Sequence, residues 1–258
     1  MNPFVKTPHL PRSPVRLCAI GAGWDYIANA LEQRGIEVFQ LPPHPGLPPP
    51  VSCHADMLLH HLGEGGVVLA EGMDRAAAAM VFSGFLVTTA PLQAEYPGDI
   101  ALNCFVLKKY LFCEQENTAE SLLNYYQLNG AEVVPIRQGY AKCSVCIVDE
   151  ESAITADMGL AAAMEQRGIQ VLRVCQGHIQ LPGYPFGFIG GCAAKLDKNQ
   201  LAFFGELSTH PDALIIRQFC LERGVAPVSL CAGPLTDIGG AIPLREESSI
   251  QNGMSEKI

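Results

Sequence analysis

The thiol chemistry that this chain could perform centres on Cys143. It follows Lys142, and an ammonium group lowers the pKa of a neighbouring thiol when the two head groups meet. Adjacent residues of a strand point to opposite faces, however, so the alternative is a buried and inert thiol. Cys192 and Cys53 are weaker candidates for the same role.

Histidines that could carry protons for such a thiol occur in two places. His54 and Asp56 form a His-x-Asp pair, which predicts an imidazole and a carboxylate on one face of a strand. His178 begins a long loop that is rich in glycine and aromatic residues. Tyr184 in that loop could cover a ligand, or it could pack as an ordinary aromatic side chain. The sequence therefore predicts His54 or His178 as the proton carrier.

Composition narrows the class of protein. The 258 residues are 48% hydrophobic and 17% charged, which is typical of a globular chain and not of a disordered one. The net charge of −9 disfavours a nucleic-acid binder, which needs a basic surface. No apolar run approaches the roughly 20 residues of a membrane-spanning helix. With no export signal, we expect a cytoplasmic protein whose ten cysteines are free thiols.

The sequence predicts no metal site and no cofactor. Cys143 and Cys146 form the only C-x-x-C, and no second pair completes a zinc site. The segment Ile20–Trp24 (IGAGW) lies between a predicted strand and a predicted helix, as a dinucleotide fingerprint does. Tyr26 stands where the third glycine of that fingerprint should be, so we expect these glycines to serve the strand-to-helix turn.

A short repeat reveals the elements that would position these residues. Residues 30–38 (ALEQRGIEV) match residues 163–171 (AMEQRGIQV), and weaker copies occur in three other places. Each copy predicts a helix that ends at a glycine in the left-handed conformation and is followed by a strand. The five glycines are Gly35, Gly84, Gly130, Gly168 and Gly224.

Between these helices, four segments predict β-hairpins. They are Asp56–Leu62 with Gly66–Ala70, Asp99–Leu107 with Tyr110–Cys113, Lys142–Val148 with Ser152–Thr155, and Phe188–Leu196 with Gln200–Phe204. The fifth module has only an inner strand near Asp237–Leu244, and Val15–Ile20 could supply its missing strand. The sequence therefore predicts an α/β propeller of five pseudo-symmetric modules. Helices lie outside, short strands surround a central channel, and the N-terminal strand closes the fifth module.

This organisation predicts a single domain over residues 15–244. Its modules cover about residues 22–72, 73–115, 116–157, 158–207, and 208–244 together with 15–21. Residues 1–14 are expected to be a Pro-rich extended arm and residues 245–258 a polar tail.

Several motifs carry a resemblance to a known family. They are residues 96–103 (YPGDIALN), 137–144 (RQGYAKCS), 154–157 (ITAD), 177–184 (GHIQLPGY), 186–191 (FGFIGG) and 235–240 (LTDIGG). Together they resemble a bacterial family of unknown function that is assigned to the pentein fold, also called the guanidino-group-modifying-enzyme fold. The resemblance spans about residues 15–244 and implies five modules around an axis, but a fold does not fix a function.

The chain departs from active penteins at two positions. Those enzymes use a Cys nucleophile in the last module, a His in the fourth, and carboxylates that hold the guanidinium group. The Cys expected after Gly239 and Gly240 is absent, because Ala241 follows. No His stands near Ile189 and Gly190, so the usual thiol chemistry cannot be transferred to these positions.

Aligning the modules brings three charged residues to one level of the channel. Asp56, Asp99 and Lys142 would begin their inner strands at equal depth, with Asn103 and Asp237 as further polar residues nearby. Such a set could bind a zwitterionic or cationic molecule, or its charges could simply neutralise one another. Glycines beside the channel could let a ligand approach the backbone, or could allow tight packing at the axis. They are Gly190, Gly191, Gly239 and Gly240.

Two functions stay open. The first is a polar small-molecule site in the channel for an amino-acid-like or guanidino compound, with thiol-dependent hydrolysis or transfer if the site is catalytic. The alternative is a non-catalytic pentein scaffold that binds a macromolecular partner, since the fold is similar to that of a ribosome-binding translation factor. An exposed apolar patch would favour the second function.

Overall fold

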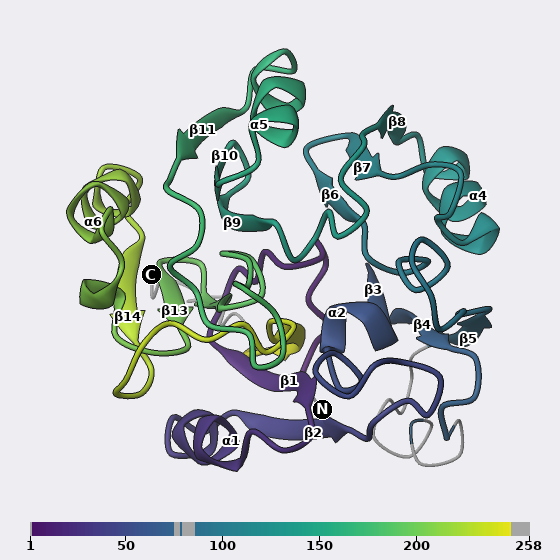
Figure 1. Ribbon diagram of the computed structural model, residues 1–258, viewed down its shortest axis with the longest axis horizontal. Helices are drawn as coiled ribbons and strands as arrows, with labels where there is room; N and C mark the ends of the chain where they lie inside the picture. Colours follow the sequence, from purple (N-terminus) through teal and green to yellow (C-terminus); the bar gives the residue numbers. More distant parts are fainter. Residues whose placement is uncertain (1, 75–77, 79–85, 249–258) are drawn as a thin grey trace, which may run out of the picture.

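The computed structural model describes residues 2–74, 78 and 86–248 of the chain. In this part, five three-stranded sheets are arranged around a common axis, which confirms the predicted five-module α/β propeller (Figure 1). In every sheet the middle strand pairs antiparallel with the inner strand and parallel with the outer strand. The helix predicted before Gly84, and Gly84 itself, lie outside the described residues.

The sheets follow one another around the ring in the order of the sequence. From inner to outer strand they are β3 (Leu59–Gly63), β4 (Gly66–Ala70) and β5 (Leu86–Ala90); β6 (Phe105–Leu107), β7 (Tyr110–Cys113) and β8 (Glu132–Pro135); β9 (Val145–Asp149), β10 (Ser152–Thr155) and β11 (Gln170–Arg173); β12 (Ala193–Asp197), β13 (Gln200–Phe203) and β14 (Ala226–Ser229); and β15 (Ile242–Glu246), β1 (Val15–Gly21) and β2 (Glu37–Leu41).

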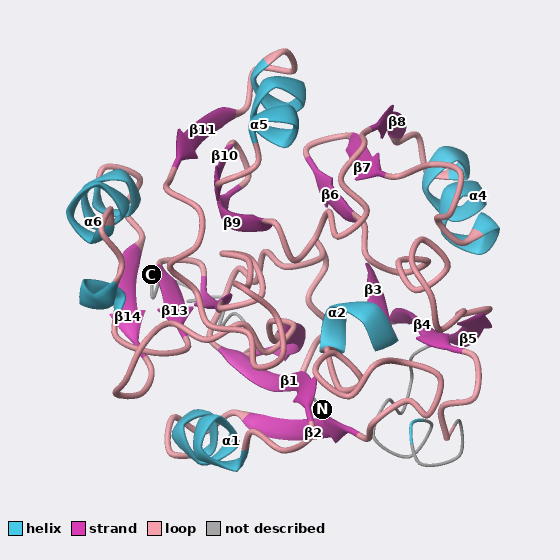
Figure 2. Cartoon of the chain, viewed as in Figure 1, coloured by secondary structure: helices cyan, strands magenta, loops and turns pink. Residues whose placement is uncertain are grey.

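The longer helices lie at the periphery, and loops converge on the centre (Figure 2). The helices are α1 (Asp25–Glu32), α2 (Ala55–Leu58), α4 (Glu120–Leu128), α5 (Met158–Glu165) and α6 (Ala213–Leu221), with a 3₁₀ turn at Leu207–Thr209. Four of the predicted helix-ending glycines, Gly35, Gly130, Gly168 and Gly224, have φ between 68° and 81°, a region that only glycine enters without strain. None of the described helices is long and apolar enough to cross a bilayer.

The fifth sheet joins the two ends of the chain. β1 pairs antiparallel with β15, with Ala19 opposite Ile242, and parallel with β2, with Ala19 opposite Phe39. β1 therefore takes the place that the second hairpin strand holds in the other modules, as the incomplete fifth repeat predicted. Closure in this way leaves no module without its middle strand.

The inner hairpin strands begin later than predicted. Residues 139–144 form turns before β9 begins at Val145, and residues 187–192 form irregular backbone and turns before β12 begins at Ala193. The prediction placed Asp56, Asp99 and Lys142 at the start of strands, and this is wrong for all three.

The segments at both ends are more tightly packed than predicted. In the N-terminal arm, the amide of Val5 donates to the Leu244 carbonyl at 3.0 Å, and His9 is buried. At the other end, Arg245 and Glu246 are buried within β15. Glu246 accepts a 2.9 Å hydrogen bond from the amide of Ser13, so the arm and the end of β15 hold each other in place.

Apolar and polar side chains separate between the modules and the axis. Four apolar clusters fill the spaces among sheets and helices, and they contain most of the large buried side chains, such as Phe105 and Phe203. Buried polar side chains gather around the centre instead. Among them are His9, His54, Asp56, Asp99, Asn103, Lys142 and Asp237. Because buried polar groups need partners, the contacts of this central set decide what the molecule can do.

Candidate active site

His54 and Asp56 are positioned by a single helical turn and not by a strand. The carbonyl of His54 accepts hydrogen bonds from the amides of Met57 and Leu58, at 3.0 and 3.2 Å, and this closes α2. The amide of Asp56 donates to the Gly239 carbonyl at 3.2 Å, which ties the turn to the fifth module. The strand-face argument for the His-x-Asp pair is therefore wrong, although both side chains do reach the same cluster.

Asn103 holds the backbone of Cys143 in place. Its Oδ1 accepts hydrogen bonds from the amides of Lys142 and Cys143, at 2.8 and 3.2 Å. Its Nδ2 lies 3.2 Å from the Sγ of Cys143 and donates to the carbonyl of Asp56 at 3.3 Å. One buried amide thus links the two segments that carry the thiol and the carboxylate, so Asn103 is a positioning residue and not a ligand contact.

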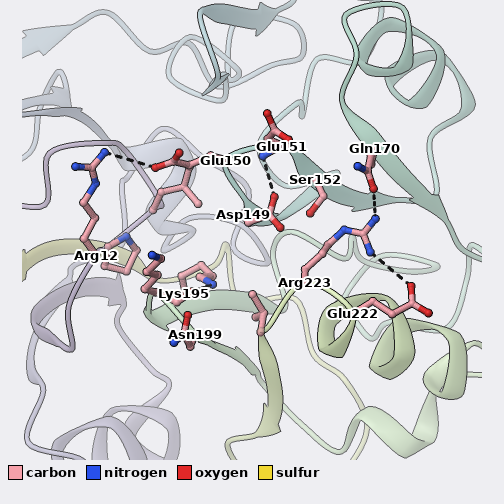
Figure 3. Close-up of a pocket in the computed structure, with 14 residues that line it drawn as sticks. Arg12, Asp149, Glu150, Glu151, Ser152, Gln170, Lys195, Asn199, Glu222 and Arg223 are labelled. Atoms are coloured by element: carbon pink, nitrogen blue, oxygen red, sulfur yellow. Dashed lines mark hydrogen bonds and ion pairs between the residues drawn. The ribbon is translucent and has the colours of Figure 1, made fainter.

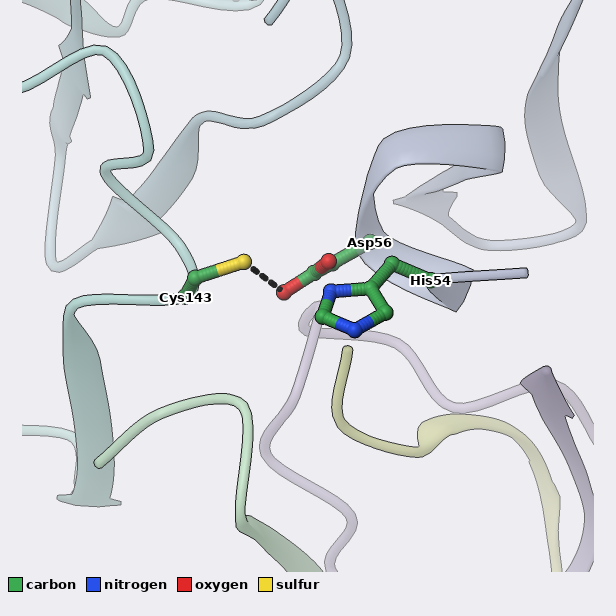
Figure 4. Close-up of side chains that lie close together, drawn as sticks. All are labelled: His54, Asp56 and Cys143. Carbon is green, nitrogen blue, oxygen red and sulfur yellow. Dashed lines mark hydrogen bonds between the residues drawn. The ribbon is translucent and has the colours of Figure 1, made fainter. Parts of the chain in front are cut away.

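The thiol of Cys143 meets the carboxylate of Asp56, not the ammonium of Lys142. Sγ donates to Oδ2 of Asp56 at 2.8 Å, with the imidazole of His54 beside the carboxylate (Figure 4). Burial, followed by the charges of Asp56 and Asp237, raises the pKa of Cys143 well above its ordinary value. Burial also raises the pKa of Asp56 to about 6. At neutral pH the pair is therefore a protonated thiol facing a carboxylate that can accept its proton.

His54 faces a second carboxylate. Its Nδ1 lies 3.9 Å from Oδ1 of Asp237, and both residues are buried. The oxygens of Asp237 are fixed in turn by the amides of Gly239 and Phe188, each at 2.9 Å. Within the described part of the chain, Nε2 of His54 and Oδ1 of Asp56 have no hydrogen-bond partner, although both are buried. Buried polar atoms without partners are rare, and a bound ligand, an ordered water or a role in proton transfer can explain them.

A pocket of about 220 Å³ opens above this cluster. His54, Cys143 and Asp237 supply its polar surface. The remaining lining residues are apolar or aromatic: Val51, Met57, Tyr140, Leu181, Tyr184, Pro185, Phe186 and Phe188. The pocket therefore joins a thiol, an imidazole and a carboxylate to an aromatic wall, which is the combination that small-molecule sites typically show.

Several residues predicted to touch a ligand have other partners. Asp99 accepts a 2.8 Å hydrogen bond from Tyr140 and does not line the pocket. Nζ of Lys142 donates to the Gly190 carbonyl at 3.3 Å, and the residue lines a small cavity shared with His9. Asp56 lies behind Cys143 and outside the lining of the pocket. None of the three charged residues lines the pocket, although Lys142 lies near enough to Asp56 for its charge to oppose the rise that burial causes in the pKa of Asp56.

His178 is not part of the cluster. It is exposed, and its ring packs edge-on against His210 at a centroid distance of 5.7 Å. Its own loop supplies Tyr184, Phe186 and Phe188 to the pocket, so the loop reaches the site although its histidine does not. Cys192 is buried with its Sγ donating to the carbonyl of Ile189, which favours the inert alternative for that thiol.

The glycine pairs serve close packing of the protein with itself. A Cβ at Gly191 would collide with the Asp237 carboxylate, one at Gly239 with His54, and one at Gly190 with the carbonyls of Val145 and Lys142. Gly240 has φ of 71° and faces the Gly190 carbonyl. Protein atoms, not a ligand, therefore fill the space beside these glycines. This agrees with the second of the two expectations, tight packing at the axis.

Tyr140 and Asn103 have roles in the structure that the sequence did not predict. Tyr140 lies in the segment 137–144 that carried the family resemblance, yet nothing in that segment indicated that its ring would line the pocket. The sequence predicted that Asn103 binds a ligand. An amide side chain at the start of an inner segment can equally accept hydrogen bonds from the backbone of a neighbouring segment. The apolar lining residues Val51, Met57 and Leu181 look like ordinary core residues in sequence and gave no signal.

The cluster also has the donor types of a metal site. One ligand atom each from His54, Asp56 and Cys143 lie within 4.8 Å of one another, and three protein ligands are what a catalytic zinc takes. The same thiol donates a hydrogen bond to Asp56, so the cluster can also move a proton between these two groups. A metal ion bound by the three residues would take the place of the thiol proton.

A larger hollow lies elsewhere, between hairpins β9–β10 and β12–β13 and the N-terminal arm (Figure 3). Its volume is about 810 Å³, and we call it the charged groove. Arg12 lies 3.5 Å from Glu150, and Arg223 lies 3.9 Å from Glu222. The charged groove also holds two buried polar residues, Lys195, whose Nζ donates to the Lys198 carbonyl, and Ser152, whose Oγ has no hydrogen-bond partner among the described residues. Its described lining contains neither a thiol nor an imidazole, which the pocket has.

Five modules with this topology, closed by the N-terminal strand, define the pentein fold, and solved structures agree. SxtG, an amidinotransferase of saxitoxin biosynthesis from Microseira wollei, has a TM-score of 0.60 at 9% identity, over 96% of this chain and 98% of its own. Inosamine-phosphate amidinotransferase StrB1 from Streptomyces griseus has 0.60 at 11%, over 95% and 98%. DDAH from Pseudomonas aeruginosa, a cysteine-to-serine mutant complexed with citrulline, has 0.54 at 10%, over 88% and 96%.

Residues 23–242 match the model of a family described as "Family of unknown function (DUF6873)". The chain belongs to this family. No curated protein matches the chain. At 9–11% identity the solved structures establish the fold alone, so function must be argued from the pocket itself.

Proposed function

We propose that the pocket binds a small compound with a guanidino or amidino group and that Cys143 attacks the central carbon of that group. The observation that carries this proposal is the hydrogen bond of 2.8 Å from the Cys143 thiol to the buried carboxylate of Asp56, next to a pocket that also exposes His54 and Asp237. Solved structures of the same fold include amidinotransferases and a complex with citrulline.

The charges of the site support a cationic ligand. Asp237 lines the pocket, and the buried carboxylate of Asp56 lies behind the thiol and outside the lining. A carboxylate in a desolvated site favours an opposite charge beside it. A planar cation with several N–H donors could bond to Asp237 and place its carbon above Sγ of Cys143.

The same groups can perform a balanced reaction. Asp56 accepts the thiol proton, Sγ forms a bond to the guanidino carbon, and the C–N bond to the leaving amine breaks as Asp56 passes the proton to that amine. A covalent thiouronium results. Water, or an amine acceptor in a transfer reaction, then attacks the carbon while Nε2 of His54 takes its proton. The C–S bond breaks, and that proton returns to the sulfur. In hydrolysis the second proton of the water leaves the product oxygen for the released amine or the solvent.

Paired reagents test whether a cationic group is directed to this thiol. 2-Chloroacetamidine carries a planar cation, whereas 2-chloroacetamide is its neutral counterpart. With rates normalised to glutathione, we expect Cys143 to be alkylated at least tenfold faster by the amidine, as located by mass spectrometry. Cys175 serves as the internal control because it is exposed and lies beside the carboxylate of Asp212, so it measures the preference that a carboxylate at the surface produces. We expect the preference at Cys143 to be clearly larger.

Two variants sharpen this test. Cys143→Ser should abolish the preferential labelling, and Cys175→Ser should leave it unchanged. Equal rates for both reagents at Cys143 would contradict the proposal. That result would favour the scaffold alternative. Among the described residues, the exposed apolar side chains of Leu214, Ile215 and Leu221 share α6, and Leu128 is exposed on α4.

A further inference from the structure

The walls of the pocket differ in chemistry from its floor. The floor carries the thiol, the imidazole and the carboxylate, whereas Val51, Met57 and Leu181 line the sides with aliphatic carbon. Four aromatic rings complete the walls, those of Tyr140, Tyr184, Phe186 and Phe188. No Lys or Arg occurs among the described residues that line the pocket.

Basic side chains near the pocket in sequence do not change this picture. Lys142 directly precedes the nucleophile, but its ammonium is bound to the Gly190 carbonyl and lines the separate cavity beside His9. Arg137 precedes Tyr140 by three residues, yet it is exposed and outside the pocket lining. A carboxylate on a bound ligand would therefore lack a cationic partner.

A ligand carboxylate would also meet unfavourable surroundings. Inside the pocket it would lie near Asp237, and like charges repel strongly in a desolvated space. The charge of Asp56, behind the thiol, is offset in part by that of Lys142, so Asp237 is the main source of this repulsion. Against the aliphatic walls it would lose its water without gaining a hydrogen bond. Both effects weaken binding of an amino acid that carries a carboxylate in the same molecule as the guanidino group.

The aromatic walls favour an apolar remainder. Phe186 and Phe188 pack edge to face at 6.2 Å, and Tyr140 lies 6.2 Å from Phe188, so three rings form a continuous surface. Rings of this kind attract a planar cation at its face and an apolar group by burial. The volume of about 220 Å³ is below the roughly 300 Å³ at which sites for drug-sized ligands begin, which limits the substrate to a small molecule.

We infer that the substrate is a small guanidine or amidine whose remaining part is apolar and carries no carboxylate, so that arginine-like amino acids are excluded. This inference rests on the proposed function. Of the two classes of compound expected from the sequence, it keeps the guanidino compounds and excludes the amino-acid-like ones. The absence of a cationic residue from the described lining, together with the carboxylate of Asp237, sets the preference.

A matched pair of ligands tests the inference. Benzylguanidine and 4-(guanidinomethyl)benzoic acid differ by one carboxylate, and the Cys143→Ser protein permits binding to be measured without turnover. We expect benzylguanidine to bind at least 30-fold more tightly by isothermal titration calorimetry, and arginine to bind more weakly still. Equal affinities, tighter binding of the acid or arginine, or no binding of benzylguanidine would each overturn the inference. The proposed function is judged separately, by the amidine labelling of Cys143.

A variant can reverse the preference. Tyr184 is 43% exposed at the pocket and can accept a longer side chain. Tyr184→Arg would supply the missing cation, and we expect it to improve binding of the acid about tenfold relative to benzylguanidine. Tyr184→Gln, which removes the same ring without adding charge, is the control. If both ligands still bind Tyr184→Arg and the ratio of their affinities is unchanged, the lining of this pocket does not cause the preference against the carboxylate, and the inference is overturned.

Discussion

The two hollows of the molecule differ in size and in how their polar groups are partnered. The charged groove is the larger, at about 810 Å³, and its arginines lie beside glutamates at an exposed surface. The pocket holds about 220 Å³, and buried atoms without hydrogen-bond partners, His54 Nε2 and Asp56 Oδ1, lie at or just behind its floor. Atoms of this kind also occur elsewhere, and Ser152 Oγ lines the charged groove, but at the pocket they belong to an imidazole and a carboxylate that lie next to a thiol. The grouping of titratable side chains is therefore a better guide to the site than volume.

The largest effect that tests the difference between the pocket and the charged groove is expected on the turnover rate. Asp56→Asn keeps the shape of the side chain but removes the acceptor of the Cys143 proton. With a guanidino or amidino substrate that the wild type converts, we expect the turnover rate to fall by about 10²–10⁴-fold, the range for loss of a general base. Glu150→Gln, in the charged groove, is the matched carboxylate control. A similar loss in both variants would remove the distinction between the two hollows.

The next effect concerns the clamp on Cys143. Asn103→Leu removes the acceptor of the buried amides of Lys142 and Cys143. Each unsatisfied amide costs about 1–3 kcal/mol, so we expect the free energy of unfolding to fall by about 4 kcal/mol in denaturant titrations. Asn103→Asp keeps an acceptor oxygen and is the control for the amide bonds. If Asn103→Leu were as stable as the wild type, Asn103 would not be the positioning residue described above.

A third effect depends on pH. An unfolded carboxyl group releases its proton near pH 3.8, whereas burial raises the pKa of Asp56 to about 6 in the folded protein. Between these values the folded state binds more protons, so this group lowers stability as pH rises, and the loss is complete above pH 6. Two pKa units correspond to about 3 kcal/mol.

Asp56→Asn removes this cost. We expect the variant to be more stable than the wild type by up to about 3 kcal/mol at pH 8 and no more stable at pH 4, in denaturant titrations. Glu150 is exposed, so Glu150→Gln should show no such dependence on pH. A stability difference for Asp56→Asn that stays constant from pH 4 to pH 8 would contradict the assigned burial of the charge.

The sequence predicted the fold more reliably than the site. Helix-ending glycines and the incomplete fifth module are local patterns, and they sufficed to predict that β1 closes the ring. The thiol and its neighbours depend instead on where irregular segments point. Lys142 and Cys143 are adjacent, yet one contacts Gly190 and the other Asp56, 87 positions away in the chain. No spacing rule covers such turns, because their direction is set by contacts such as those of Asn103.

The same reasoning explains which of the two predicted histidines lies in the cluster. His54 is held by α2 and by close contact with Gly239, so its ring is directed toward Asp237. His178 lies on an exposed part of its loop, where hydration of the ring competes with any fixed orientation. Both histidines looked equal in sequence, since a glycine-rich aromatic loop and a His-x-Asp pair are each typical of sites.

The smallest effect belongs to the charged groove. The side chains of Arg12 and Glu150 are 64% and 69% exposed, and such pairs contribute about 0–1 kcal/mol because water screens them. We expect Arg12→Ala to change the free energy of unfolding by less than about 1 kcal/mol and to leave labelling of Cys143 by chloroacetamidine unchanged. Asn103→Leu, measured beside it, sets the scale for a buried partner. If Arg12→Ala destabilised the protein as much as Asn103→Leu does, then exposure would not separate the two hollows. The loss of stability in Arg12→Ala would then have to come from weaker packing of the N-terminal arm against β15.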